Sequence, residues 1–147
     1  QQMREQVLQH LAAASIVIKA AAVSDFKPKA IAGQKIKKDG QPLVLELVPN
    51  PDILKEVGAK KEGRILVGFA AETESVLQNG QKKLKEKSLD LLVANDVSQA
   101  GAGFDSDTNI VTILTRDGHQ VQLDKRSKAE VAHEILNQIL AFRKRHA

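Results

Sequence analysis

Apolar residues follow two alternating patterns along the chain, and together these patterns predict an α/β fold. Nearly continuous apolar runs of strand length occupy residues 15–23, 43–48, 64–71 and 89–94. Before and between these runs, apolar residues recur with helical spacing over residues 3–13, about 51–60 and about 74–87. A continuous apolar run is typical of a strand that is covered on both faces, as in a parallel sheet. The order of the elements therefore predicts right-handed crossovers and a mainly parallel sheet.

The last part of the chain has a different pattern, which predicts an antiparallel hairpin followed by a helix. Residues 109–116 and 119–124 have strand character and flank Asp117-Gly118, a dipeptide that favours a tight hairpin turn. Residues 127–130 have the Ser-x-x-Glu pattern of a capping box, which starts a helix. We expect the hairpin to extend one edge of the parallel sheet.

Three segments are predicted to lack regular secondary structure. Residues 27–42 are rich in Lys, Gly and Pro, and they predict a basic loop or flap that includes Lys35. Residues 99–107 contain repeated glycines and predict a flexible loop. The end of the chain, residues 142–147, is expected to fray.

The composition is that of an ordinary globular chain, and it removes several classes of function. The chain has 147 residues, of which 42% are hydrophobic, and this fits one domain. No apolar run approaches the roughly 18–20 residues of a membrane helix, so no membrane partner is expected. The absence of cysteine excludes disulfides, thiolate zinc sites and a cysteine nucleophile, and it favours a cytoplasmic protein. A net charge of +4 fits a small anionic ligand as well as a polymer.

Three predicted strands end in small residues followed by an acidic or polar residue. These strand ends are Ala21–Asp25, Phe69–Thr73 and Val93–Asp96. Ligands bind at the carboxyl ends of the strands in an open parallel sheet, so we expect a crevice there with carboxylates on its rim. The alternative is structural: the alanines fill tight contacts between sheet and helices, and the acids cap helices.

Lysines and a helix start supply the complementary positive charge for this crevice. Lys83 and Lys87 are four residues apart and share one helix face, while Lys35 lies in the basic flap, which can close over a phosphate. The helix that starts at residues 50–53, with Asn50 as its expected cap and Pro51 at its first position, offers free backbone N–H groups. Together these features suggest a nucleotide with a divalent cation, in which Mg²⁺ bridges phosphate oxygens to one or two acids. The alternative for the lysine-rich helix is a solvated face.

The motifs, taken in order, resemble those of the phosphopantothenate–cysteine ligases. They are Ala21–Pro28, Lys35–Lys38, Asn50–Leu54, Val67–Thr73, Lys83 with Lys87 and Asp90, Ala94–Val97 and Phe104–Asn109. The resemblance extends from about residue 14 to residue 140. It implies a dimeric, Rossmann-like three-layer α/β sandwich.

The resemblance also implies an activity and a set of partners. Such ligases activate the carboxylate of 4′-phosphopantothenate with CTP and Mg²⁺, form an acyl-cytidylate with loss of pyrophosphate, and let the amine of cysteine displace CMP. This chemistry needs neutralised phosphate charge, close geometry and exclusion of water. The residues alone leave the choice between CTP and ATP open.

Individual roles follow from the same resemblance. Lys35 is expected to be the catalytic flap lysine, and Asp25 is expected to hold Mg²⁺ or the nucleotide. The full set of expected nucleotide-binding residues is Ala21, Asp25, Lys35, Pro51, Asp52, Ile53, Leu54, Phe69, Lys83 and Lys87.

The sequence departs from the family at its beginning. The family's first strand, its Gly-Gly-Thr turn and its Ser-Ser-Gly segment have no counterpart here, and neither has the decarboxylase domain with its FMN. We therefore expect residues 1–147 to form one domain that is most of a ligase domain, truncated at its N-terminus. Two alternatives remain: a non-catalytic nucleotide-binding or dimerisation fragment, and a basic nucleic-acid-binding domain. With only four aromatic residues the chain has few stacking platforms, so no nucleic-acid partner is expected.

Overall fold

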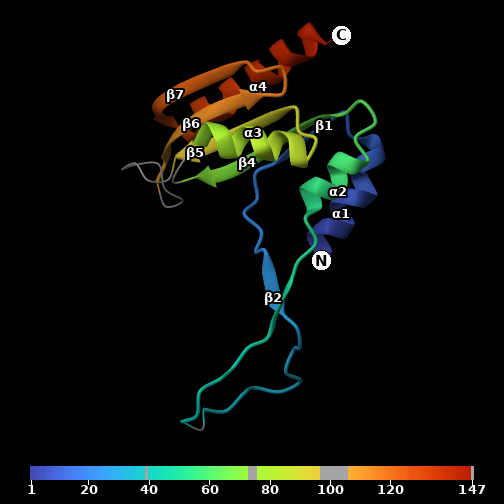
Figure 1. The fold of residues 1–147 in the computed structure, drawn as a ribbon, viewed down its shortest axis with the longest axis vertical. Helices are drawn as coiled ribbons and strands as arrows, with labels where there is room; N and C mark the ends of the chain where they lie inside the picture. The colour runs from blue at the N-terminus through green and yellow to red at the C-terminus, as the bar shows by residue number, and fades with distance from the viewer. Residues whose placement is uncertain (39, 73–75, 97–105, 147) are drawn as a thin grey trace.

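A five-stranded mixed sheet forms the centre of the computed structural model, which describes all residues except 39, 73–75, 97–105 and 147 (Figure 1). Its strands, in spatial order, are β1 (Ile16–Lys19), β4 (Ile65–Glu72), β5 (Leu91–Asp96), β6 (Thr108–Thr115) and β7 (Gln120–Ser127). The first three strands are parallel, and β6 and β7 form an antiparallel hairpin beside β5. The predicted α/β class with an antiparallel hairpin at one edge is confirmed.

Helices cover both faces of this sheet, which gives the three layers that were expected. They are α1 (Gln2–His10) with the short 3₁₀ helix η1 (Leu11–Ala13), α2 (Ile53–Ala59), α3 (Val76–Glu86) and α4 (Lys128–Arg145). Neighbouring strand residues face opposite ways, so Val67 packs with the α4 side and Leu66 packs with the side of α2 and α3. No helix among the described residues is both long and apolar enough to cross a membrane.

The apolar run 43–48 was predicted as a strand of the parallel sheet, and this prediction is wrong. The structure instead pairs β3 (Leu47–Pro49) with β2 (Phe26–Pro28) in a separate two-stranded antiparallel ribbon. This arm, residues 26–38 and 40–49, extends away from the sheet (Figure 1). The described residues between β1 and β3 contain no helix that could form a crossover, so the run cannot return to the sheet beside β1. The basic flap predicted at residues 27–42 forms most of the arm.

Helix ends correct two further expectations and confirm a third. Asp52, and not Asn50, caps α2, because its side chain accepts a hydrogen bond from the backbone N–H of Lys55. The capping box of Ser127 and Glu130 is present at the start of α4. The end of the chain does not fray from residue 142, since α4 continues to Arg145 and the side chain of Phe142 is buried.

Candidate functional site

An open cleft of about 700 Å³ lies at the carboxyl ends of the parallel strands β1 and β4. This is the edge at which parallel sheets bind ligands, and the volume falls within the range of small-molecule sites, roughly 300–1,000 Å³. One wall is formed by residues 19–25 after β1, residues 50–53 at the start of α2, and residues 69–71 of β4. The opposite wall is formed by β5, β6 and the first turns of α4.

Most of the expected site residues meet in this cleft. Those that line it are Ala21, Asp25, Pro51, Asp52, Ile53, Phe69, Lys83 and Lys87. They come from four separate parts of the chain, which the strand order brings together. With Lys19 and Lys128, the lining contains two carboxylates and four lysines, which is the charge pattern of a site for an anion with a bridging cation.

Lys35 and Leu54 do not line the cleft. Lys35 lies in the exposed part of the arm. Leu54 is on the inner face of α2 and is only 5% exposed, within the apolar core. Its Cδ2 atom would lie 2.8 Å from a Cβ at Gly68, so Leu54 fills the space that this glycine leaves between α2 and β4.

An ion pair joins the start of α2 to the end of α3 at the cleft. Oδ2 of Asp52 lies 2.9 Å from Nζ of Lys87, and the two side chains are 41% and 30% exposed. Burial opposes the ionisation of Asp52, but the hydrogen bonds from Lys87 and from the backbone of Lys55 outweigh it and lower the pKa of the carboxyl. Lys19, at the end of β1, adds a weaker electrostatic contribution in the same direction. Asp52 is therefore ionised and paired with Lys87.

The segment after β1 is fixed to the start of α2 by main-chain contacts. The side-chain amide of Asn50 donates a hydrogen bond to the carbonyl of Ser24 at 2.9 Å, and the backbone N–H of Asn50 donates to the carbonyl of Asp25 at 2.7 Å. Nζ of Lys19 donates to the carbonyl of Ala21 at 3.2 Å. These contacts hold the carboxylate-bearing segment at the base of the arm against the cleft.

The residues fit a magnesium ion only when the ligand supplies most of the coordination. Among the described residues, no group of three His, Cys, Asp or Glu side chains can enclose a metal. Asp25 and Asp52 both line the cleft, but Asp52 forms an ion pair with Lys87. Mg²⁺ commonly binds to one or two carboxylates together with phosphate oxygens and water, and Asp25 suits this mode.

The far wall of the cleft contains residues that sequence reasoning missed. Asn109 of β6 and Lys128 of α4 line it, together with apolar residues of α4. Oδ1 of Asn109 is buried and has no hydrogen-bond partner among the described residues. No local signal marks Lys128, because α4 reaches the cleft only by packing across the sheet after the hairpin. Asn109 ends one of the motifs that carry the family resemblance, but no role was assigned to it.

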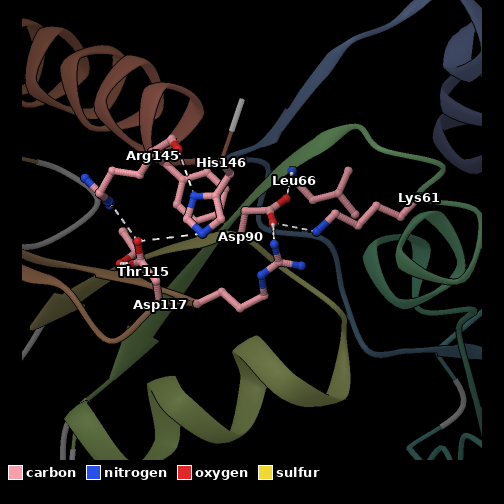
Figure 2. Close-up of polar contacts among 9 residues, drawn as sticks. Lys61, Leu66, Asp90, Thr115, Asp117, Arg145 and His146 are labelled. Atoms are coloured by element: carbon pink, nitrogen blue, oxygen red, sulfur yellow. Dashed lines mark hydrogen bonds and ion pairs between the residues drawn. The ribbon is translucent and has the colours of Figure 1, made fainter.

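A second group of polar contacts lies at the opposite edge of the sheet, before β4 and β5 (Figure 2). Oδ1 of Asp90 lies 2.5 Å from Nζ of Lys61, and Oδ2 accepts a hydrogen bond from the backbone N–H of Leu66 at 2.9 Å. Nearby, Asp117 accepts hydrogen bonds from Thr115 and from Arg145, the latter at 2.8 Å. These contacts connect loops and the end of α4, and they lie away from the cleft.

Comparison with known proteins places the chain among pantothenate-pathway proteins. A family model described as the DNA/pantothenate metabolism flavoprotein C-terminal domain matches residues 1–142. The chain is 54% identical over 142 residues to the coenzyme A biosynthesis bifunctional protein CoaBC of Bacillus subtilis (strain 168). This match covers 97% of the chain and 35% of the relative, so the chain spans about a third of the length of that protein.

Two solved structures have the same fold. A crystal structure of the C-terminal domain of the coenzyme A biosynthesis bifunctional protein CoaBC matches with a TM-score of 0.76 and 40% identity, covering 94% of the chain and 59% of that structure. The DNA/pantothenate metabolism flavoprotein from Streptococcus pneumoniae matches with a TM-score of 0.74, covering 95% of the chain and 69% of that structure. At 22% identity the second likeness concerns the fold alone.

Proposed function

The chain belongs to the family of DNA/pantothenate metabolism flavoprotein C-terminal domains, and on that premise we propose that it acts in coenzyme A biosynthesis as the nucleotide-binding part of a CTP-dependent ligase. The proposed reaction joins 4′-phosphopantothenate to cysteine. The observation that supports it best is the cleft at the carboxyl ends of β1 and β4, where eight of the ten expected nucleotide-binding residues meet.

The proposed chemistry depends on charge neutralisation and positioning. A carboxylate oxygen of 4′-phosphopantothenate attacks the α-phosphorus of CTP, pyrophosphate leaves, and the amine of cysteine then attacks the acyl carbon and releases CMP. Lys83 and Lys87 would balance the phosphate charge, since ammonium groups bind phosphate as point charges. Mg²⁺, when bound, neutralises phosphate oxygens, and Asp25 would hold it. Pro51, Ile53 and Phe69 offer an apolar wall for the base.

The chain spans only part of the proteins that it resembles. The chain covers 59% of the matching domain structure and 35% of the bifunctional relative from Bacillus subtilis. We therefore assign nucleotide binding to the chain, and the complete ligation to the longer protein. The alternative is a non-catalytic nucleotide-binding or dimerisation module. An assay of pyrophosphate release by the longer protein, with CTP, 4′-phosphopantothenate and cysteine, distinguishes the two. Lys83→Gln or Lys87→Gln is expected to slow the release if the cleft serves the ligase, and to leave it unchanged if the chain is a non-catalytic module.

Nucleotide binding itself is tested by calorimetry of this chain with CTP and Mg²⁺. Lys83→Gln and Lys87→Gln are each expected to weaken binding about tenfold, because each removes one charge-assisted contact. Lys82→Gln is the matched control, since Lys82 lies on the same helix, is 71% exposed and does not line the cleft. Unchanged affinity in both cleft variants contradicts the assignment, and titration with ATP measures the choice of base.

A homodimer is part of the proposal, and the arm supports it. Apolar side chains on the arm are exposed to a degree that is unusual for a monomer: Phe26 and Leu45 are each 58% exposed, and Val44 is 88% exposed. We expect a second copy to cover them. Sedimentation of Leu45→Ser is expected to show weakened association, whereas Leu140→Ser, on the 55% exposed Leu140 of α4, serves as the matched control. Association that is the same in both variants contradicts a role for the arm.

A further inference from the structure

Helix α2 contacts Lys87 at two points, one on its side chain and one on its backbone. The ammonium lies 2.9 Å from Oδ2 of Asp52, the N-cap residue of α2. Further along the same helix, Gly58 is buried against the main chain of Lys87, and a Cβ at Gly58 would overlap the carbonyl oxygen of Lys87. The helix therefore fixes the backbone and the side chain of Lys87 separately.

The two oxygens of Asp52 have different partners. Oδ1 accepts the capping hydrogen bond from the backbone N–H of Lys55 at 3.1 Å, while Oδ2 faces Lys87. The capping hydrogen bond therefore holds the carboxylate on the helix independently of its contact with Lys87. Both side chains line the cleft and keep part of their surface open to it.

We propose that Asp52 is a positioning residue that holds the Lys87 ammonium at the wall of the cleft for an anionic ligand. An ammonium has three N–H donors, and one contact with Asp52 leaves the others for phosphate oxygens. A lysine that is already held also loses less conformational entropy when the ligand binds. The inference rests on the proposed function, because it specifies how the cleft receives the phosphates of a nucleotide.

The first test is the affinity of this chain for CTP with Mg²⁺ in Asp52→Asn. Asparagine caps a helix as well as aspartate does, so α2 is retained while the negative charge is removed. Binding is expected to weaken about 3- to 10-fold, the size of one partly exposed ion pair. Asp124→Asn is the matched control, since it removes the same charge from an exposed residue of β7 outside the cleft, and its affinity is expected to stay within about twofold. Tighter or unchanged binding in Asp52→Asn overturns the proposal. A carboxylate that only repelled the anionic ligand would give tighter binding once its charge is removed.

The second test asks whether Asp52 acts through Lys87. In a Lys87→Gln background, Asp52→Asn is expected to change the affinity less than about twofold, since the group that it positions is absent. An equal loss in both backgrounds overturns the proposal.

The third test needs no ligand. Carbon-13 relaxation of the lysine ε-methylene groups is expected to show a lower order parameter for Lys87 in Asp52→Asn and an unchanged one in Asp124→Asn. If wild type fails to bind CTP but Lys87 loses order in Asp52→Asn, the proposed function is wrong and the positioning of Lys87 stands. If the order of Lys87 does not change, the positioning is wrong whatever the affinity for CTP.

Discussion

Two lysine–aspartate ion pairs lie at opposite ends of the parallel strands. They join the same types of side chain but differ in how far they are buried. Asp52 and Lys87, at the carboxyl ends of the parallel strands, are 41% and 30% exposed. Asp90 and Lys61, whose contact Figure 2 shows, lie at the amino ends and are 2% and 18% exposed. The exposed pair lines the cleft, whereas Asp90 of the buried pair already has a second cation, because Nη2 of Arg116 lies 3.6 Å from its Oδ1.

The buried pair shows what a structural role requires. Both oxygens of Asp90 have partners, and its backbone N–H and carbonyl bond to Leu66 and Arg116 at 2.9 and 2.8 Å. A buried charge persists only when its partners compensate for the lost water, and Asp90 meets this condition by joining the starts of β4 and β5 to the end of β6. The comparison teaches that the same kind of ion pair stabilises the fold where it is buried and, under the proposed function, serves a ligand where it is exposed.

The largest expected effect is at the buried pair. Asp90→Ala leaves Lys61 without its counter-charge and the backbone N–H of Leu66 without an acceptor, so we expect a loss of about 3–5 kcal/mol in the free energy of unfolding. Denaturant unfolding measures it. Asp90→Asn, which keeps an acceptor of the same shape, is expected to lose less, and a loss under about 1 kcal/mol in Asp90→Ala would show that the pair is not structural.

Gly58→Ala is expected to have the next largest effect on stability. Gly58 lies where α2 packs against the main chain of Lys87, a member of the exposed ion pair. The new Cβ overlaps the carbonyl of Lys87, which is backbone and cannot rotate away, so the loss should be about 1–3 kcal/mol. Gly33→Ala is the matched control, because no atom lies within 4 Å of its added Cβ. Equal thermal stability of the two variants would contradict the close approach of α2 to α3.

Substitution of Asp117, near the buried pair, is expected to have a smaller and pH-dependent effect on stability. Hydrogen bonds from Arg145 and Thr115 lower the pKa of its carboxyl strongly, against a small opposing effect of burial. The pKa of this carboxyl is lower in the folded protein than in the unfolded chain, where it is about 4. The ionised carboxylate therefore stabilises the fold above about pH 4, and this contribution is lost as the pH falls further. Asp117→Asn should therefore cost about 1 kcal/mol at pH 7 and progressively less below pH 4 in unfolding measured across pH. A cost that does not change with pH would contradict this account.

The smallest effect on stability is expected at the exposed pair. Asp52→Asn keeps the cap of α2 and removes an ion pair whose partners are 41% and 30% exposed, so the free energy of unfolding should change by under about 0.5 kcal/mol. Thermal unfolding of Asp52→Asn beside Asp90→Asn checks the contrast directly. A larger loss at Asp52 than at Asp90 would reverse the comparison.

Local patterns were sufficient for most elements of the fold. The Ser127–Glu130 box and the Asp117-Gly118 turn depend only on neighbouring residues, and both are present in the structure. The apolar run 43–48 was misjudged because hydrophobicity alone does not show what a segment packs against, and Val44 and Leu45 are 88% and 58% exposed in the structure. The end of α4 was misjudged for a related reason, since Phe142 packs against residues that are distant in sequence.

The sequence by itself determined the α/β class, the strand ends that line the cleft, and the spacing of Lys83 in α3 and Lys87 directly after it. Each depends on the spacing of residues within one element. The tertiary structure decided which carboxylate meets which lysine, that Asp52 faces Lys87 and Asp90 faces Lys61, and that Lys128 and Asn109 close the far wall. Such pairings depend on strand order and on how closely helices approach, and these distances are set by packing between segments far apart in the chain.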